Sequence, residues 1–594
     1  MNPTSEILER INRSSNDHSD GVFTRLYRYL LREDIYYAAY QRLYANAGAM
    51  TQGADRDTAD GFGQVYIASL INELKSFTYQ PKPVRRVYIP KPNGKQRPLG
   101  IPSFRDKLLQ EAVRCILEAI YEPLFSDCSH GFRPERSCHT ALMQIKHKFR
   151  SVKWFIEGDI KGCFDNINHQ KLIEILQIKI KDSKFINVIR LFLKAGYIED
   201  FDYNTTLSGT PQGGVISPIL ANIYLHELDK KVMELKQAFD RPAHRYQSAE
   251  YVSISKRRQT LQKKIARATA EEKPAILQEY KAVCKQKKST PARLSEDKKL
   301  VYCRYADDFL IGVSGNREDC ERIKTELKDF LMDGYSLELS DEKTKITHSA
   351  EPVRFLGYDV AVRRSQQLKR RSDGTVTRTL NNSVALTIPL EDKIMKFLFA
   401  HEVIQQRQDG QVWHVAIPRL RHKSELDIVR QYDWRIRGIC NYYRLAANYN
   451  KLHYFRYLME YSCLKTLASK SGSTTAKILR KYKTSDGWGI PYQTATGTHI
   501  AQLAKLADCK KGKFMIDRDP WKYKSYSERG LTLRQRLERC KCELCGESSA
   551  RCSIHHAGSM KNCKDDTEWG RKMLGMRRKT LVVCESCHAK IHGT

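Results

Sequence analysis

Apolar residues along the chain gather in short runs that predict strands around three aspartates. Residues 154–159 form an apolar run that ends in Asp159, and residues 301–312 form two apolar, aromatic halves separated by Asp307 and Asp308. β-Branched and aromatic side chains favour strands, whereas adjacent aspartates suit a tight turn better than a strand interior. The pattern therefore predicts a strand that delivers Asp159 at its end and a β-hairpin with Asp307 and Asp308 at its tip.

Other segments show the signals of a turn between strands or the periodicity of helices. Residues 84–107 contain two short strand-like runs around a basic turn marked by Pro90 and Gly94. Residues 235–300 are basic and helix-prone, and their apolar residues are too sparse to form a core, so we expect a helical hairpin insertion there. Residues 383–490 are expected to be helical. The fold class that follows is a multidomain α+β protein.

Composition adds a polyanionic partner to this picture. The 594 residues are enough for three or four domains, and 41% of them are hydrophobic, which is sufficient for real cores. The formal net charge is +34, from 102 Lys and Arg against 68 Asp and Glu, and an excess of this size implies nucleic acid as a partner. Residues 1–20 are polar and there is no apolar run of transmembrane length. We therefore expect no membrane association and a cytosolic location, where the 17 cysteines are thiols or metal ligands.

The three aspartates are candidate ligands of divalent cations. Two aspartates held side by side repel each other, which favours a bound cation, and hard oxygen ligands suit Mg²⁺. Asp159 makes a third carboxylate available, as a two-metal site with ions about 3.5–4 Å apart requires. For Asp307 and Asp308 on their own, an ordinary acidic turn is the alternative.

The C-terminal end carries a second kind of metal-ligand pattern. Two C-x-x-C pairs have the spacing of a tetrahedral four-cysteine zinc site, in which a small domain gains its folding energy from the metal. These cysteines are Cys542, Cys545, Cys584 and Cys587. Between the pairs lie His555 and His556, while His588 and His592 are four residues apart and share one helical face. A zinc ribbon with bystander histidines is the alternative.

The motif that ends in F-D at residues 164–165 and the Y-A-D-D box together resemble those of a reverse transcriptase. In that family the two motifs carry the catalytic aspartates, which implies that Asp159, Asp307 and Asp308 bind Mg²⁺ here. The carbonyl group of Ile160 is expected to complete one of the metal sites. The resemblance implies a right-hand polymerase with fingers, an RRM-like palm sheet and an α-helical thumb.

The resemblance to reverse transcriptases also implies a nucleotide-binding set. The basic hairpin would form a lid over the incoming nucleotide, with Lys91 and Arg97 gripping the triphosphate. Phe164 would stack on the deoxyribose and reject a 2′-hydroxyl, and the P-Q-G-G turn would place Gln212 near the active site. A solvated basic turn and a core phenylalanine are the alternatives.

The C-terminal end resembles an HNH endonuclease of the ββα-metal type. This resemblance implies that His555, His588 and His592 hold a divalent ion, with Mg²⁺ the expected metal, against the scissile phosphate. His556 would act as the general base on water, while the four cysteines hold a structural Zn²⁺. The central Asn of the motif is not evident, and Asn562 is a doubtful stand-in.

The order of these motifs resembles that of group II intron-encoded proteins of the bacterial mitochondrial-like class. The resemblance divides the chain into five parts. They are an N-terminal extension (1–60), the reverse transcriptase fingers and palm (61–363, with the insertion at 235–300), a thumb and maturase (X) domain (383–490), a DNA-binding region (491–538) and an HNH domain (539–594).

The family implies three activities: RNA-directed DNA synthesis by target-primed reverse transcription, assistance to intron RNA splicing, and cutting of the second target strand for intron mobility. The implied partners are group II intron RNA in a lariat ribonucleoprotein, double-stranded target DNA and dNTPs, with a homodimer as a further expectation. An RNA-binding maturase without polymerase activity is one alternative, and the intact aspartates argue against it. A defence or diversity-generating reverse transcriptase is another, which would ordinarily lack both the X region and the HNH tail.

Overall fold

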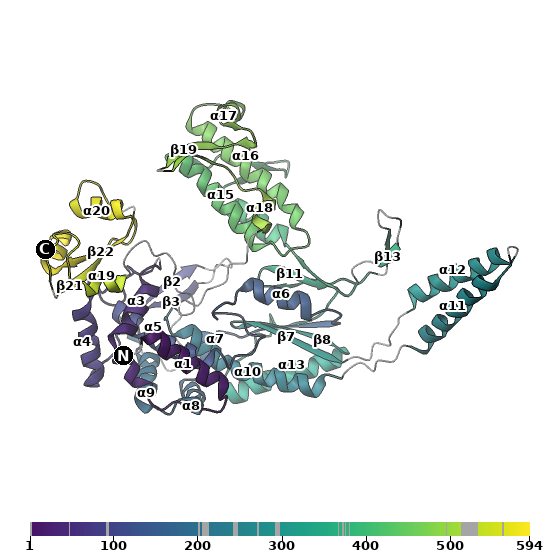
Figure 1. The fold of residues 1–594 in the computed structure, drawn as a ribbon, viewed down its shortest axis with the longest axis horizontal. Coiled ribbons are helices and arrows are strands. Elements are labelled where there is room, and N and C mark those ends of the chain that lie inside the picture. Colours follow the sequence, from purple (N-terminus) through teal and green to yellow (C-terminus); the bar gives the residue numbers. More distant parts are fainter. Residues whose placement is uncertain are drawn as a thin grey trace.

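The structure, a computed structural model, is built around a central sheet with lobes on either side (Figure 1). No helix in the part of the chain that it describes is long and apolar enough to cross a membrane. The described residues are 3–46, 48–90, 94, 96–199, 202–204, 209, 213–241, 248–269, 272–290, 298–365, 367–370, 374, 376–378, 381–494, 496–511, 533–549, 551–560 and 563–593.

The central sheet contains both of the strand patterns that the sequence predicts. Its order is β7 (Lys299–Tyr305), β8 (Asp308–Ser314), β4 (Trp154–Asp159) and β9 (Ile346–His348), and all neighbours are antiparallel. β7 and β8 form the predicted hairpin, and β4 ends on an aspartate as expected. These two predictions are confirmed.

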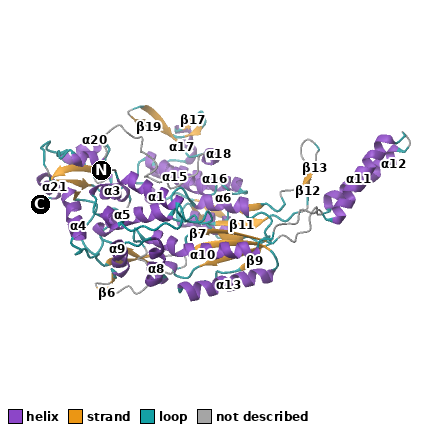
Figure 2. Ribbon diagram, turned by 60° about the horizontal axis from the view of Figure 1, so that its bottom comes forward, coloured by secondary structure: helices purple, strands orange, loops and turns teal. Residues whose placement is uncertain are grey.

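The central sheet is buried on both faces, as Figure 2 shows by the helices on either side of the strands. On one face lie α10 (Ser217–Phe239) and α13 (Arg317–Tyr335), and on the other lies α6 (Cys138–Lys148). Successive strand residues point to opposite faces, so Phe155 packs on the α6 side and Ile156 on the α10 side. Two continuous cores therefore fix the ends of the strands.

The N-terminal part packs on the same core as α10. The buried helix α5 (Phe104–Tyr121) contacts both α1 (Thr4–Asp17) and α3 (Glu33–Leu43). Ser103 caps α5 by accepting a hydrogen bond from the backbone N–H of Asp106. The N-terminal extension is thus an integral layer of the main body.

The basic hairpin of the sequence analysis is present in a second sheet. Its order is β3 (Gln96–Ile101), β2 (Val84–Pro90), β5 (Tyr197–Glu199) and β6 (Asp202–Asn204). The antiparallel pairing of β2 with β3 confirms the predicted pair of strands around a turn.

Sheet pairing continues beyond the central sheet. β11 (Tyr358–Val362) pairs with both β10 (Val353–Phe355) and β14 (Val384–Thr387), so strands on either side of the segment 363–383 share one sheet. The helices α15 (Glu425–Tyr442) and α16 (Leu452–Lys470) pack together in the core on the α6 side.

The prediction of helix throughout residues 383–490 is right for α15 and α16 and wrong for several shorter segments. β14 completes a sheet, and β15 (Ile404–Gln406) and β16 (Val412–His414) form a separate hairpin. The alternation of Val384 and Leu386 buries one side of β14, which is the period of two expected for a strand.

The insertion at 235–300 contains the predicted helical hairpin. Its helices are α11 (Ala249–Arg267) and α12 (Lys273–Ser289), and Figure 1 shows them standing away from the main body. Their shared core is formed by Ile254, Leu261 and Val283, which agrees with the sparse apolar pattern.

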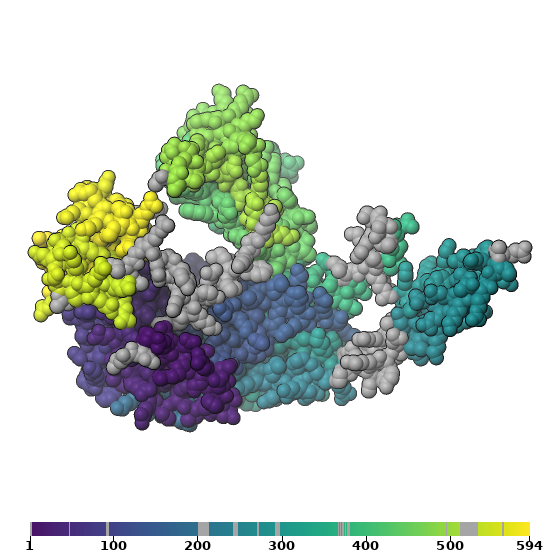
Figure 3. Space-filling model, in the orientation of Figure 1, coloured from purple at the N-terminus to yellow at the C-terminus, as the bar shows by residue number. Residues whose placement is uncertain are grey.

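The C-terminal part is a small ββα unit that lies against the N-terminal part, yellow against purple in Figure 3. It contains β21 (Cys552–His556), α20 (Glu568–Met576), β22 (Thr580–Cys584) and α21 (Glu585–His592). The two-residue strand β1 (Phe62–Gly63) pairs antiparallel with the free edge of β21. A strand from the start of the chain thus completes the C-terminal sheet.

The remaining helices and strands cover the sheets or connect these units. They are α2 (Tyr27–Leu30), α4 (Gln64–Lys75), α7 (Cys163–Asn166), α8 (His169–Lys179), α9 (Ser183–Lys194), β12 (Leu368–Arg370), β13 (Val376–Arg378), η1 (Leu390–Met395), α14 (Lys396–Ala400), η2 (Pro418–Leu420), η3 (Tyr449–Lys451), α17 (Thr475–Lys481), β17 (Lys483–Thr484), β18 (Gly487–Trp488), β19 (Ile490–Thr494), β20 (Gly497–Ala501), α18 (Leu506–Lys511) and α19 (Leu533–Glu538).

Candidate active sites

Asp159, Asp307 and Asp308 meet at one end of the central sheet. The antiparallel register pairs Asp159 of β4 directly with Asp308 of β8, and Asp307 stands in the turn before β8. The turn passes through Ala306, whose φ of 57° is in the left-handed region. A Cβ at Gly131 would lie 2.4 Å from the nitrogen of Ala306, so the loop behind the turn can approach only because it has glycine there.

The electrostatics of this acidic cluster favour a bound cation. Burial, together with the charges of Asp307 and Asp159, raises the pKa of Asp308 to about 7. Burial also raises the pKa of Asp307. Lys343 relieves part of the repulsion, because its Nζ lies 2.8 Å from Oδ2 of Asp159. Hard carboxylate oxygens in this arrangement fit Mg²⁺, whose charge would remove the remaining repulsion.

The other predicted polymerase residues lie around this cluster where the structure describes them. Ile160, the residue directly after Asp159, is buried and forms a β-bridge with Leu339. Arg97 is exposed on β3, and its charge acts to lower the pKa of Asp307. Phe164 is half-buried, with its ring edge-on to that of Phe132 at 6.3 Å. Lys91 and Gln212 lie outside the described residues.

A buried ion pair that the sequence analysis missed supports the turn of the acidic cluster. Arg304 and Asp229 are both fully buried, and two hydrogen bonds of 2.6 and 2.7 Å join the guanidinium to the carboxylate. Nη1 of Arg304 also donates to the carbonyl oxygen of Ala306 at 2.9 Å, one residue before Asp307. Although burial opposes it, the charge of Arg304 lowers the pKa of Asp229 to about 2. The pair therefore ties α10 to the turn.

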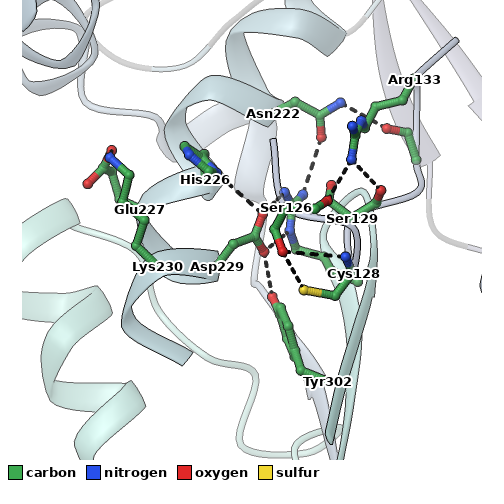
Figure 4. Close-up of polar contacts among 12 residues, drawn as sticks. Ser126, Cys128, Ser129, Arg133, Asn222, His226, Glu227, Asp229, Lys230 and Tyr302 are labelled. Carbon is green, nitrogen blue, oxygen red and sulfur yellow. Dashed lines mark hydrogen bonds and ion pairs between the residues drawn. The ribbon is translucent and has the colours of Figure 1, made fainter. Parts of the chain in front are cut away.

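Figure 4 shows how this network extends to the loop behind the turn. Tyr302 donates its hydroxyl to Asp229 at 2.9 Å. Asn222 accepts from Arg304 and donates to the carbonyl oxygen of Gly131 at 2.8 Å. Arg133 donates to the carbonyl oxygens of Ser126 and Ser129, which rigidifies the same loop. The position of the aspartates is thus set by a connected polar network in the core.

Breaking this network is expected to be costly. Arg304→Met leaves Asp229 buried without its counter-charge, and we expect the free energy of unfolding to fall by about 3–5 kcal/mol in chemical denaturation. The control is Arg317→Met, whose exposed ion pair with Glu321 should contribute about 1 kcal/mol or less. The double variant Asp229→Leu/Arg304→Met should recover part of the loss, and equal losses in all three variants would rule out a special role for the pair.

The second candidate site lies at the junction of the C-terminal unit with the N-terminal part. His555 of β21 and His588 and His592 of α21 surround the carboxylate of Asp60. The distances to the Asp60 oxygens are 3.3 Å from Nδ1 of His555, 3.1 Å from Nε2 of His588 and 2.9 Å from Nε2 of His592. Although burial opposes it, hydrogen bonds from the neighbouring imidazoles and the backbone N–H of His556 hold the pKa of Asp60 well below its usual range.

This cluster fits a divalent cation. One ligand atom from each of its four residues lies within 4.8 Å of the others. His555 is 4% exposed, and its Nε2 has no hydrogen-bond partner among the described residues. Imidazole nitrogens with a carboxylate oxygen are a donor set that suits Zn²⁺ and other divalent ions.

His556 points away from this cluster and is enclosed. His556 is only 2% exposed, and its Nε2 lies 3.2 Å from the carbonyl oxygen of Tyr44. Its Nδ1 accepts a hydrogen bond of 3.1 Å from the backbone N–H of Gly558. Burial lowers the pKa of His556, which favours the neutral imidazole that a general base requires.

The four cysteines of the two C-x-x-C pairs form a compact group, as the spacing predicts. Sγ of Cys545 lies 3.8 Å from Sγ of Cys584. Zinc–sulfur bonds of about 2.3 Å in a tetrahedron separate sulfur atoms by nearly this distance. A hydrogen bond with Ser586 is the main cause that lowers the pKa of Cys584 to about 6, which favours the thiolate. The group fits a structural zinc ion.

Asp60, Lys343, Asp229 and Arg304 are the functional residues that sequence reasoning missed. An arginine inside the apolar run of residues 301–312 was a usable signal, because a buried charge needs a partner. No sequence signal pairs Asp60 with the histidines, since 495 residues separate it from His555.

Comparison with known proteins identifies the domains that contain the two candidate sites. Family models match residues 89–360 as "Reverse transcriptase (RNA-dependent DNA polymerase)", residues 381–527 as "Type II intron maturase" and residues 542–588 as "AI2M/AI1M-like, HNH endonuclease". The chain is 50% identical to "Group II intron-encoded protein LtrA" of Lactococcus lactis subsp. cremoris, over 100% of this chain and 99% of that protein.

Two fungal proteins are more distant relatives. The chain is 35% identical to the "Uncharacterized 91 kDa protein in cob intron" of Schizosaccharomyces pombe, covering 98% of this chain and 72% of that protein. It is 31% identical to the "Putative COX1/OXI3 intron 2 protein" of Saccharomyces cerevisiae, covering 98% of this chain and 68% of that protein.

The fold, the sites and these matches define a reverse transcriptase that carries an HNH endonuclease domain. The chain belongs to the group II intron-encoded proteins, and it is a multifunctional enzyme with reverse transcriptase, intron maturase and HNH endonuclease domains.

Proposed function

We propose that Asp159, Asp307 and Asp308 are the catalytic carboxylates of the reverse transcriptase, with the carbonyl group of Ile160 as a further ligand. The observation that carries this proposal is the strand register that sets Asp159 beside Asp308. Two Mg²⁺ ions held there would activate the primer 3′-hydroxyl and stabilise the leaving pyrophosphate. The buried network through Arg304 keeps the turn rigid, which is what positioning of reacting groups requires.

The surrounding elements suit a right-hand polymerase. In this proposal the sheet β7-β8-β4-β9 is an RRM-like palm, β2 and β3 belong to the fingers, and α15 and α16 form the core of the thumb. Arg97 would bind the triphosphate of the incoming dNTP, together with Lys91 and Gln212, and Phe164 would exclude a 2′-hydroxyl. The exposure of Arg97 and the effect of its charge on the pKa of Asp307 support its part.

The maturase domain is proposed to bind intron RNA through exposed aromatic and basic side chains. Trp434 is 66% exposed on α15, and Tyr454 is 55% exposed on α16. The ring of Trp413 lies against both Arg407 and Lys465, at 4.5 and 4.9 Å. Unpaired RNA bases stack on such rings, and cations beside them bind the phosphates.

The domain limits predicted from the sequence are proposed as functional divisions: 1–60, 61–363 with 235–300 inserted, 383–490, 491–538 and 539–594. The whole protein is proposed to act in the bacterial cytoplasm, as a ribonucleoprotein with the intron lariat, either alone or as a homodimer. In this scheme the intron RNA inserts into one strand of double-stranded target DNA. The HNH domain then cuts the other strand, and the 3′-hydroxyl left there primes reverse transcription.

In the HNH domain, His556 is proposed as the general base, with His555, His588 and His592 as ligands of a divalent ion, Mg²⁺ in this proposal. That ion, when bound, would stabilise charge on the scissile phosphate. Cys542, Cys545, Cys584 and Cys587 would hold a structural Zn²⁺ apart from the chemistry. The separation of His556 from the three other histidines supports this division of roles.

His556→Ala tests the endonuclease assignment. Loss of a general base is expected to slow DNA cutting by about 10²–10⁴-fold, while cation binding stays unchanged. The measurement is nicking of supercoiled plasmid DNA in Mn²⁺, beside primer extension on an annealed primer, which the variant should retain. His147→Ala, which alters an exposed histidine on α6, is the control. Normal nicking by the His556 variant would refute the proposed role.

Primer extension by the purified protein on an RNA template, with Mg²⁺ and dNTPs, tests the polymerase assignment. If the wild type extends the primer and a variant of Asp159, Asp307 or Asp308 does not, catalysis takes place at the acidic cluster. A protein that binds structured RNA but extends no primer would favour a maturase without polymerase activity.

A further inference from the structure

The HNH histidines share their site with a residue from the other end of the chain. Asp60 directs its carboxylate at His555, His588 and His592, and its Oδ2 lies about equally far from the last two, at 3.1 and 2.9 Å. Ligands bound at about 2.1 Å in a tetrahedron stand nearly this far apart. The three histidines and Asp60 therefore make a complete four-ligand set.

Backbone pairing holds Asp60 in this position. Gly61 donates its N–H to the carbonyl oxygen of Ile554 at 2.9 Å, and β1 pairs with β21 immediately beyond. The backbone N–H of His556 donates to Oδ1 of Asp60 at 2.6 Å. A Cβ at Gly63 would lie 2.6 Å from the carbonyl oxygen of Cys552, so the close approach of the two strands needs glycine there.

The number of protein ligands distinguishes a structural metal site from a catalytic one. Among four-coordinate sites of the zinc type, structural sites are closed by four protein ligands, whereas catalytic sites keep one position for water or substrate. With the three histidines alone, the fourth position would be available to the scissile phosphate. With Asp60 in place, that position is filled by a carboxylate of this same chain.

We propose that Asp60 is the fourth ligand of the HNH cation, and that it holds the endonuclease in a closed, latent state until a DNA phosphate takes its place. The inference rests on the proposed function of the three histidines. It gives residues of the N-terminal part a regulatory role over a reaction at the other end of the chain.

The same contact also covers the proposed general base. The carbonyl oxygen of Tyr44 lies 3.2 Å from Nε2 of His556, and the ring of Tyr44 stands edge-on to the imidazole at 6.2 Å. With Nε2 of His556 against this carbonyl oxygen and Nδ1 accepting from the backbone N–H of Gly558, neither ring nitrogen is free to take a proton from water. The closed state thus blocks both the cation position and the base.

Opening this state requires β1 and β21 to separate. β1 contributes two residue pairs at the edge of β21, while β21 itself has five pairs with β22. Separation of β21 from β1, which is anchored in the main core through Phe62 stacked on Tyr40, would free the cation position. A phosphate oxygen is a hard anionic ligand like the carboxylate that it would replace.

Asp60→Asn tests the proposal in the full-length protein. The four-cysteine site is first loaded with one equivalent of Zn²⁺, which thiolates prefer, and the protein is then titrated with Co²⁺. The wild type should show the strong visible absorption of four-coordinate Co²⁺. The variant should bind Co²⁺ at least about 10-fold more weakly, since the loss of even an outer-shell partner has an effect of that size.

The same variant should cut DNA faster. In saturating Mn²⁺, nicking of supercoiled plasmid should rise about 10-fold if about nine molecules in ten are closed in the wild type. Asp55→Asn is the matched control, because this carboxylate of the same loop pairs with Lys82 and not with the histidines. Unchanged Co²⁺ affinity, or nicking that is unchanged or slower, overturns the inference.

Two further measurements separate the possible failures. His592→Ala should lose the Co²⁺ site. If His592→Ala loses the Co²⁺ site while Asp60→Asn binds Co²⁺ normally, the three histidines do bind the cation and the proposed closed state is wrong. If His592→Ala itself binds Co²⁺ normally, the proposed histidine site is wrong. In the wild type, Co²⁺ should slow hydrogen exchange at the N–H groups of Gly61 and His556, which both donate across the junction. Unchanged exchange contradicts the proposal without relying on any variant.

Discussion

Asp307→Ala is expected to abolish primer extension on an RNA template while leaving intron splicing intact. The side chain stands at the tip of the β7–β8 hairpin, within the acidic cluster, and does not belong to the maturase helices α15 and α16. Loss of a metal ligand removes several kcal/mol of transition-state stabilisation, and about 4 kcal/mol already corresponds to about 10³-fold in rate. The turn should keep its shape, because Arg304 holds it through the carbonyl oxygen of Ala306.

The measurement compares the rate of primer extension with the rate of splicing of the same intron RNA. Asp341→Ala is a suitable control, since this exposed carboxylate pairs with Lys328 on the surface. It should retain normal extension. If the Asp307 variant is folded and splicing fails as well, the separation of the polymerase from the maturase function is wrong.

Removal of the zinc site is expected to unfold the HNH unit and abolish DNA cutting, while primer extension persists. The hydrophobic cluster that belongs to this unit alone contains seven buried residues. Three of them are the proposed zinc ligands Cys542, Cys584 and Cys587, and the other four are Cys563, Met573, Leu581 and Val583. So small a core cannot stabilise two strands and two helices alone. Structural zinc contributes about 10–16 kcal/mol in small domains, so its loss should be decisive.

Cys584→Ser tests this expectation, with zinc content and hydrogen exchange over residues 552–592 as the measurements. Exchange there should become fast, while exchange over the central sheet stays slow. Cys540→Ser changes a cysteine outside the four-cysteine group and should bind zinc normally. A zinc-free Cys584 variant that keeps slow exchange would show that docking on the N-terminal part holds the unit without metal.

Several parts of the fold were predictable because they depend on neighbouring residues. The hairpin around Asp307 follows from strand-forming residues on either side of a turn. The C-x-x-C pairs and the spacing of His588 and His592 are also local, since one turn of chain brings each pair together. The short strands within 383–490 were missed because runs of three or four residues are outweighed by the longer helices around them.

The sequence by itself determined the central strands, the hairpin, the helical insertion, the four-cysteine group and the histidines of the second site, because most of these features are encoded within short segments of the chain. Only the tertiary structure decided which distant groups meet. It paired Asp229 with Arg304 across 75 residues and set Asp60 against His555 across 495. Such contacts depend on how whole helices and strands pack, and no local pattern of residues specifies that packing.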